Sequence, residues 1–351
     1  MRLSSNLEHN ERLSESGATV GMASRDAQTT VVTFGETMLR LSPPGHGRLA
    51  RATSLDAHVG GTESNVACAL AQLGTPVSWV SRLPENALGR LVEAQLRLAG
   101  VDTSGIRWSE DGRLGLYFVE HGSEPRPTRV LYDRQDSAFA RLNPGEFDWP
   151  TILEGSRVFH TTGITLALGL GSRQALFDAA EAAREAAVLV SFDLNYRANL
   201  WSREQAERAY REVAPLVDVL FCSPAELARL LGTGAESPRD LILRSRDEWN
   251  LGRAILAVRA GESISYATLD DETELLESRA YAPRAVERFG AGDAAAAAFL
   301  HSLVEGKDER YAVELAAAAS ALQHTLPGDI ASFTLDELED VARGQEGDLL
   351  R

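Results

Sequence analysis

A short glycine-rich segment late in the chain has the composition of a phosphate-binding site. Gly290, Ala291 and Gly292 are followed directly by Asp293 and then by a predicted helix over residues 294–304. Glycines let the backbone approach a ligand closely, and the amides and dipole at a helix start favour an anion. A carboxylate there is suited to removing a proton from an attacking hydroxyl. Such a carboxylate also commonly caps the helix itself, so spacing alone leaves both roles of Asp293 open.

Two other polar clusters have compositions suited to binding hydroxyls and an anion. One runs from Gly60 and Gly61 to Asn65 at the start of a predicted helix, where it is either a capped turn or a backbone surface for a polyol. The other runs from Asp193 to Arg197, directly after a predicted strand. The guanidinium fork of Arg197 fits a carboxylate or phosphate, although arginines are more often solvated at the surface.

The standard nucleotide-binding motifs are missing from the sequence. No Gly-Lys-Ser/Thr follows a glycine-rich loop, so there is no Walker motif, and no dinucleotide fingerprint follows the first predicted strand. The glycine-rich turn comes late and lacks an acidic ribose ligand at the expected offset. These features weigh against a dehydrogenase.

Strands and helices alternate along most of the chain, which predicts an α/β fold with a mostly parallel sheet covered by helices on both faces. Residues 113–135 break this rhythm and predict two strands joined by a turn, which we expect to form an antiparallel flap. With residues 37–58 this flap would make a small β lid over the strand ends, where open α/β sheets usually bind ligands. The predicted strands and helices are residues 30–34, 77–80, 157–160, 188–193, 217–222 and 254–258, and residues 65–73, 87–99, 172–187, 205–213 and 225–231, respectively.

Composition and charge exclude several classes of function. The 351 residues carry a formal net charge of −16, which repels nucleic acids and anionic membranes, and no apolar run approaches the length of a membrane span. Cys68 and Cys222 are far apart and show no metal or redox spacing, so we expect two buried thiols in a reducing cytoplasm. Residues 1–29 and 346–351 are expected to be tails, with a single domain over residues 30–345.

Taken together, these segments resemble the ribokinase-like (PfkB) carbohydrate kinases, and most closely the 2-keto-3-deoxygluconate kinases among them. The resemblance covers about residues 31–341. Its general marks are the Gly60, Gly61 and Asn65 cluster and the segment from Gly290 to Asp293. Its more specific marks are the segments Phe-His-Thr-Thr-Gly-Ile-Thr at 159–165, Asp-Leu-Asn-Tyr-Arg at 193–197, Leu-Trp-Ser at 200–202 and Leu-Pro-Gly-Asp at 326–329.

The resemblance implies a ribokinase-like fold, ATP and Mg²⁺ as cofactors, and phosphorylation of 2-keto-3-deoxygluconate to its 6-phosphate. Asp293 matches the catalytic base, and the amides of Gly290, Ala291 and Gly292 match the anion hole. No residue is assigned as a direct metal ligand. The implied sugar contacts are Gly61, Asn65, Tyr117, Tyr132, Arg134, Arg197 and Asp329, and the implied nucleotide contacts are Ser223, Glu226, Arg259 and Gly261. The lid strands often pair two copies in this family, so the resemblance implies a homo-oligomer formed through the β lid.

The chain departs from the family pattern mainly around the nucleotide. Ser223 stands where asparagine is usual, Arg259 stands where lysine is common, and Ile264 or Ser265 replaces an expected glycine. In the helix after Asp293, alanines stand where phenylalanine and glycine are usual, at positions 295 and 298. These changes leave a catalytically silent sugar-binding homologue as one alternative. The nearer alternative is a kinase of another small sugar, such as 2-keto-3-deoxygalactonate, fructose or ribose.

Overall fold

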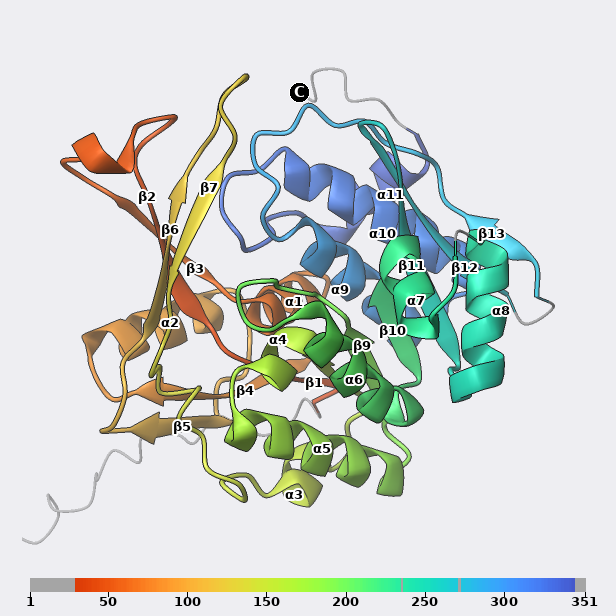
Figure 1. The fold of residues 1–351 in the computed structure, drawn as a ribbon, viewed down its shortest axis with the longest axis horizontal. Coiled ribbons are helices and arrows are strands. Elements are labelled where there is room, and N and C mark those ends of the chain that lie inside the picture. Colours follow the sequence, from red (N-terminus) through yellow and green to blue (C-terminus); the bar gives the residue numbers. More distant parts are fainter. Residues whose placement is uncertain (1–28, 235, 271–272, 345–351) are drawn as a thin grey trace, which may run out of the picture.

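A large, mostly parallel sheet forms the centre of the molecule. The computed structural model describes residues 29–234, 236–270 and 273–344, and among these residues the sheet has nine strands in the order β13-β12-β11-β10-β9-β8-β1-β4-β5 (Figure 1). The strands from β11 to β5 in this order are parallel, whereas β12 and β13 are antiparallel additions at one edge. Their bounds are β1 Val31–Phe34, β4 Val77–Pro84, β5 Ile106–Ser109, β8 Val158–Thr162, β9 Leu189–Asp193, β10 Val219–Cys222, β11 Arg253–Ala260, β12 Ser263–Leu269 and β13 Leu275–Glu277.

Helices cover both faces of this sheet and bury a separate core on each. One core lies under α1, α2, α9, α10 and α11, and the other lies under the helices from α3 to α8. Central strands such as β1 and β8 are fully buried, as expected for parallel strands covered on both sides. The helix bounds are α1 Thr62–Gln72, α2 Ala87–Leu98, α3 Trp149–Leu153, α4 Gly163–Ala167, α5 Leu170–Glu185, α6 Arg203–Val213, α7 Pro224–Leu231, α8 Pro238–Trp249, α9 Ala291–Val304, α10 Glu309–His324 and α11 Leu335–Ala342. The predicted α/β architecture is confirmed.

A second, four-stranded sheet stands beside the large one and forms the lid (Figure 1). Its order is β3-β2-β6-β7, with β6 and β7 antiparallel as predicted for the flap. The bounds are β2 Met38–Ser42, β3 Asp56–Gly60, β6 Gly115–Glu120 and β7 Arg129–Asp133. Residues 37–58 were expected in the lid without assigned strands, and backbone pairing with β2 makes residues 56–60 a strand despite their weak β propensity.

The first helix also starts earlier than its apolar spacing predicts. Gly61 is extended and takes the cap position, and Thr62, Glu63 and Ser64 form the first turn of α1. All three side chains are buried, although none is apolar, so hydrophobic periodicity could not detect this turn. Polar groups buried in this way need partners, and several of those partners belong to the site described below.

Other features of the described residues agree with the expectations from composition. Cys68 and Cys222 are both buried and unpaired with each other. Over the ranges that the structure describes, no helix is both long and apolar enough to cross a bilayer.

Candidate active site

The late glycine-rich segment forms the start of helix α9, as predicted. Gly290 takes the cap position with a positive φ of 74°, and a side chain there would meet the carbonyl oxygen of Asp329 at 2.2 Å. Only glycine suits such a backbone. At Gly292, in contrast, an added Cβ would meet no heavy atom within 4 Å. The first turn of α9 therefore has open space beside Gly292, and the unpaired amides of a helix start next to such a space favour binding of an anion.

The carboxylate of Asp293 is held by side chains of α1, far away in the sequence. Its Oδ1 accepts a hydrogen bond from the Thr62 hydroxyl and its Oδ2 accepts one from the Asn65 amide, both at 2.7 Å. Burial raises the pKa of Asp293, while the bonds from Asn65 and Thr62 and the charge of Arg197 act against that rise. The alternative role as a side-chain cap of α9 is not observed, because no side chain caps this helix.

A polar chain connects Asp293 to the segment after β9. The amide of Asn195 donates to the Thr62 hydroxyl at 2.9 Å, and Thr62 donates to Asp293 in turn. Asn195 has a left-handed φ of 39°, a conformation that asparagine tolerates better than most residues. Its backbone amide bonds to the Asp193 carboxylate at 3.0 Å. Sequence reasoning did not select Thr62, because its role depends on contacts between distant segments.

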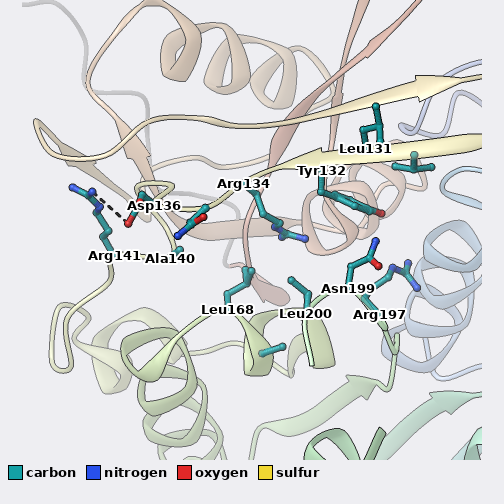
Figure 2. A pocket seen from close by; sticks show the side chains of 13 residues that line it. Leu131, Tyr132, Arg134, Asp136, Ala140, Arg141, Leu168, Arg197, Asn199 and Leu200 are labelled. Atoms are coloured by element: carbon teal, nitrogen blue, oxygen red, sulfur yellow. Dashed lines mark ion pairs between the residues drawn. The ribbon is translucent and has the colours of Figure 1, made fainter. Parts of the chain in front are cut away.

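A hollow of about 640 Å³ lies between the lid and the segment after β9 (Figure 2). Tyr132 from the lid lines one side, Arg197 and Leu200 line the opposite side, and Arg134 lies between them (Figure 2). Gly61, Asn65 and Asp293 are not among its lining residues. The charge of the exposed Arg197 nevertheless opposes the rise in pKa that burial causes at Asp193 and Asp293. The predicted guanidinium pocket therefore lies within electrostatic reach of the predicted base.

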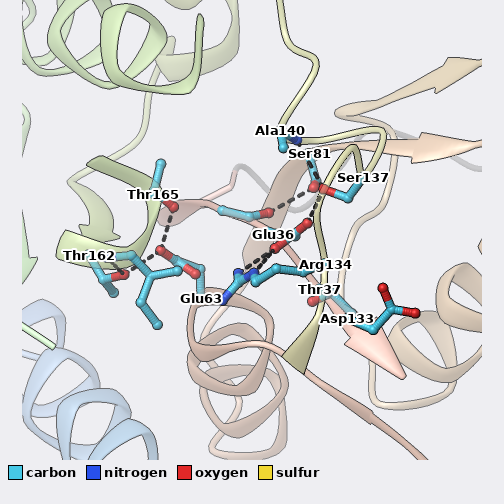
Figure 3. A network of polar contacts seen from close by, with 12 residues as sticks. Glu36, Thr37, Glu63, Ser81, Asp133, Arg134, Ser137, Ala140, Thr162 and Thr165 are labelled. Atoms are coloured by element: carbon cyan, nitrogen blue, oxygen red, sulfur yellow. Dashed lines mark hydrogen bonds and ion pairs between the residues drawn. The ribbon is translucent and has the colours of Figure 1, made fainter. Parts of the chain in front are cut away.

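Arg134 differs from Arg197 because it is already paired. Its guanidinium forms an ion pair with Glu36, and the Ser137 hydroxyl donates to the same carboxylate (Figure 3). The side chains of Arg134 and Glu36 are only 10% and 2% exposed. Arg134 thus lies at the rim of the hollow with its charge already balanced by Glu36, so it is less suited to pairing with a ligand anion than the sequence suggested.

Asp329 and Tyr117 meet beside Gly60 at the end of β3. The Tyr117 hydroxyl donates to Asp329 Oδ1 at 2.5 Å, and the Tyr117 ring stacks on Tyr132 with centroids 5.9 Å apart. An added Cβ at Gly60 would lie 2.4 Å from the Tyr117 hydroxyl and 2.8 Å from the Asp329 carboxyl carbon. The lack of a side chain at Gly60 therefore leaves room for the Tyr117 hydroxyl and the buried Asp329 carboxylate to meet.

The residues expected to contact the nucleotide occupy two neighbouring places at the sheet edge. Ser223 caps α7 and shares a capping box with Glu226, whose Oε2 accepts from the Ser223 hydroxyl at 2.7 Å. Arg259 and Gly261 lie at the exposed turn between β11 and β12. Burial, followed by the charges of Glu226 and Asp293, raises the pKa of Asp193 to about 8. The charges of Glu226 and Asp293 thus act against ionisation of Asp193.

A second buried acid, Glu63, lies in the first turn of α1 between Thr62 and the cluster's Asn65. It accepts hydrogen bonds from the hydroxyls of Thr162 and Thr165, both at 2.7 Å (Figure 3). Burial raises the pKa of Glu63 to about 7 despite these two bonds. Its carboxyl also fills the space beside Gly35, where an added Cβ would meet it at 2.1 Å. Glu63 thus ties the turn after β8 to α1 and β1.

We expect replacement of Glu63 by glutamine to stabilise the protein at alkaline pH. A carboxyl with a raised folded pKa contributes stability that is present below its unfolded pKa of about 4.5 and lost as pH rises through about 7. Glutamine keeps the acceptor for both threonines and never ionises. Thermal denaturation should show little difference at pH 5 and a gain of about 1–3 kcal/mol at pH 8.

The matched control for this test is Glu36, which is also buried but is paired with Arg134. Glu36→Gln breaks an ion pair and should lower the melting temperature at pH 8 rather than raise it. A Glu63→Gln variant that is destabilised equally at both pH values would contradict the account of Glu63 as a buried, reluctantly ionised acid.

With this geometry described, comparison with known proteins identifies the class. The family description "pfkB family carbohydrate kinase" matches residues 28–335, so the chain belongs to the PfkB family of carbohydrate kinases. Kinases of this class transfer a phosphoryl group, which agrees with a carboxylate beside free helix-start amides.

Individual relatives narrow the comparison to kinases of sugar acids. The chain is 38% identical over 321 residues to a 2-dehydro-3-deoxygalactonokinase of Haloferax volcanii, covering 92% of this chain and 99% of that protein. It is 31% identical over 321 residues to a 2-dehydro-3-deoxygluconokinase of Thermoproteus tenax, covering 90% and 95%. The crystal structure of a 2-dehydro-3-deoxygluconokinase of Thermotoga maritima superposes with a TM-score of 0.87 at 38% identity, covering 91% of this chain and 99% of that one.

Proposed function

We propose that this carbohydrate kinase transfers the terminal phosphoryl group of ATP to 2-keto-3-deoxygluconate and forms the 6-phosphate ester. The observation that carries the proposal is the position of the Asp293 carboxylate in the first turn of α9, beside the open space at Gly292 and within reach of the Arg197 charge. A base, an anion-binding helix start and a guanidinium are the groups needed to phosphorylate a hydroxyl of a sugar acid. The names of the relatives support this substrate class.

In the proposed reaction, the terminal hydroxyl oxygen of the sugar bonds to the γ-phosphorus while the bond from that phosphorus to the leaving ADP oxygen breaks. The hydroxyl proton passes to Asp293, which its two bonds from α1 hold in place. The amides of residues 290–292 offset charge on the phosphoryl oxygens. Arg197 pairs with the sugar carboxylate, and Tyr132 packs beside it at the lid. Asp329 accepts a hydrogen bond from a distal hydroxyl.

The residues at the sheet edge fit Mg²⁺ as the partner of ATP. Burial and the charge of Glu226 disfavour ionisation of Asp193, and a divalent cation beside the two carboxyls would favour their charged forms. Over the described ranges, no three acidic, histidine or cysteine side chains are arranged to chelate a metal together. Mg²⁺ suits such a site, since it typically keeps several waters and binds one or two carboxylates together with substrate phosphates. Bound Mg²⁺ would supply charge neutralisation on the phosphate oxygens.

The C4 epimer, 2-keto-3-deoxygalactonate, is the second candidate substrate. The Haloferax volcanii relative, 38% identical over nearly its whole length, is named for that epimer. A coupled assay of ADP release with both acids, fructose and ribose tests the proposal. We expect turnover of at least one acid with a kcat/KM well above that of either neutral sugar. Turnover of neutral sugars alone would refute the sugar-acid assignment. If none of the four sugars supports ADP release, the result would favour the catalytically silent homologue.

Arg197 provides a sharper test of the acid preference. We expect Arg197→Met to raise KM for the sugar acid about 10-fold to 100-fold, because it removes a charge-assisted hydrogen bond to the carboxylate. KM for ATP and the rate with a neutral sugar should change little. The measurement is a set of initial rates over both substrates at pH 7.5.

The matched control for Arg197 is Arg203, an exposed arginine a few residues away in α6. Arg203→Met should leave all constants near those of the unaltered protein. If the Arg197→Met enzyme keeps its selectivity for the sugar acid, a group other than Arg197 binds the sugar carboxylate.

The lid sheet has an open strand edge, which could support the pairing of two copies that the family resemblance implies. β7 is the outer strand of the lid sheet in the described residues, and its Leu131 and Tyr132 are 60% and 40% exposed. An open strand edge with apolar side chains is a common site for pairing with another strand. Pairing of two lids stays a prediction, as does a cytoplasmic location.

A further inference from the structure

Arg40 is a fully buried arginine in the lid strand β2, and it lies between two acids of the C-terminal part of the chain. Its Nη1 donates to Glu287 Oε2 at 2.8 Å, and its Nε lies 3.2 Å from Asp329 Oδ2. The Arg40 side chain is 0% exposed, and those of Glu287 and Asp329 are 12% and 5% exposed. A buried guanidinium is costly unless its partners are fixed, so this placement demands an explanation.

The two acids belong to loops that are tied to each other. Glu287 precedes the anion-hole glycines, and its Oε2 also accepts from the backbone amide of Gly328 at 2.9 Å. The amide of Gln323 in α10 donates to the carbonyls of Phe289 and Gly328, at 3.3 and 3.2 Å. The Phe289 ring lies under the Arg40 guanidinium, 4.9 Å from its carbon. Arg40 thus attaches the lid to the one unit that carries both the anion hole and Asp329.

Polar atoms at the centre of this arrangement lack hydrogen-bond partners. Asp329 Oδ2 and the Nε and Nη2 of Arg40 are buried and make no hydrogen bond of good geometry. Buried polar groups are normally satisfied, and unsatisfied ones often mark a place for a ligand group. Asp329 Oδ1, in contrast, is taken by Tyr117. The free oxygen of Asp329 is therefore the one that Arg40 controls.

We infer that Arg40 is a specificity-determining positioning residue, which holds the Asp329 carboxylate charged and oriented so that its free oxygen accepts a hydroxyl of the sugar. This inference rests on the proposed function, because it assumes that the sugar lies against Asp329. Arg40 itself acts through Asp329 and need not touch the substrate.

The charges around Asp329 predict how removal of Arg40 would change the protonation of the Asp329 carboxylate. Burial raises the pKa of Asp329 to about 6, and Arg40 is the first group that opposes this rise, followed by Tyr117. Asp293 and Glu287 raise the pKa further. His58 and His121 also face Arg40 and Glu287, and burial lowers the pKa of both. Without Arg40, Asp329 would bind its proton at higher pH, and its free oxygen would become a weaker hydrogen-bond acceptor.

The test compares Arg40→Met, Arg40→Lys and the unaltered enzyme across pH 5.5 to 8.5. For Arg40→Met we expect KM for the sugar acid to rise at least about tenfold at pH 7, with KM for ATP unchanged. The pH below which KM rises should move upward by about one unit or more. Arg40→Lys keeps the charge but loses the fork, so it should raise KM while leaving the pH profile near that of the unaltered enzyme.

The matched control is Arg48→Met, which removes another lid arginine from an ion pair with a glutamate, Glu120, outside the site. It should change neither KM nor the pH profile. Equal rises in both KM values, or an unshifted pH profile in Arg40→Met, would overturn the inference. If Arg40→Met does not fold, Arg40→Lys decides, and unchanged sugar KM there also overturns it. An unaltered enzyme without activity on sugar acids would instead refute the proposed function, and the inference with it.

Discussion

Replacing Asp293 by asparagine should lower kcat by about 10²-fold to 10⁴-fold, which is the usual contribution of a positioned base. Asparagine has nearly the same shape and can still accept from Thr62, and it bonds to Asn65 once the Asn65 amide turns its oxygen toward the new nitrogen. Sugar binding should therefore survive. We expect KM for the sugar acid within about threefold of the original value and an unchanged melting temperature. Steady-state rates with both substrates and a calorimetric titration of the sugar check these expectations.

The control for this variant is Asp336, an exposed acid in the first turn of α11. It shares with Asp293 a place near a helix start, where a negative charge stabilises the helix by about 0.3–1 kcal/mol. Asp336→Asn should lower stability slightly and leave kcat alone. If Asp293→Asn behaved in the same way, with small loss of stability and full turnover, Asp293 would be a helix-stabilising acid and not the base.

The second large effect is expected at Gly290, where the backbone has a positive φ and a Cβ would lie 2.2 Å from the Asp329 carbonyl oxygen. Gly290→Ala has to shift the anion-hole loop away from the loop that carries Asp329. We expect a loss of about 2–4 kcal/mol in the free energy of unfolding, from backbone strain and overpacking. Because displaced amides no longer stabilise the transferring group, kcat should fall about 10²-fold or more.

A substitution at Gly292 separates the loss of stability from the loss of kcat that we expect at Gly290. An added methyl group there meets nothing within 4 Å, so Gly292→Ala should keep the melting temperature of the unaltered protein. The methyl group projects into the space that we assign to the phosphoryl group, so activity should still fall by about tenfold or more. Full activity in Gly292→Ala would place the transferred group elsewhere, and an unaffected Gly290→Ala would show that this loop is not an anion hole.

The order of strands and helices could be predicted because buried strands and amphipathic helices leave clear periodic patterns. β1, β6, β7 and α2 lie within a few residues of their predicted positions. β3 was missed, because its pairing with β2 comes from tertiary structure and not from local propensity. The start of α1 was placed late, because its first turn is polar and turns inward to meet residues far away in the sequence.

The site shows the same limit. Asp293 and its glycines stood out because glycine and acid at a helix start form a local pattern. Thr62, Arg40 and Glu287 did not, because their roles arise from bonds that span more than two hundred residues of sequence. A buried arginine in a lid strand has no local signature at all. Arg134 was selected for its charge, yet its pairing with Glu36 is visible only in three dimensions.

The most direct test of the central claim is a crystal structure of the Asp293→Asn variant with 2-keto-3-deoxygluconate and a non-hydrolysable ATP analogue. We predict that the terminal hydroxyl lies about 3 Å from the side chain of residue 293, with the terminal phosphate at the amides of residues 290–292. The sugar carboxylate should lie against Arg197. A sugar acid bound away from Arg197, or a phosphate distant from the start of α9, would contradict the proposed mechanism.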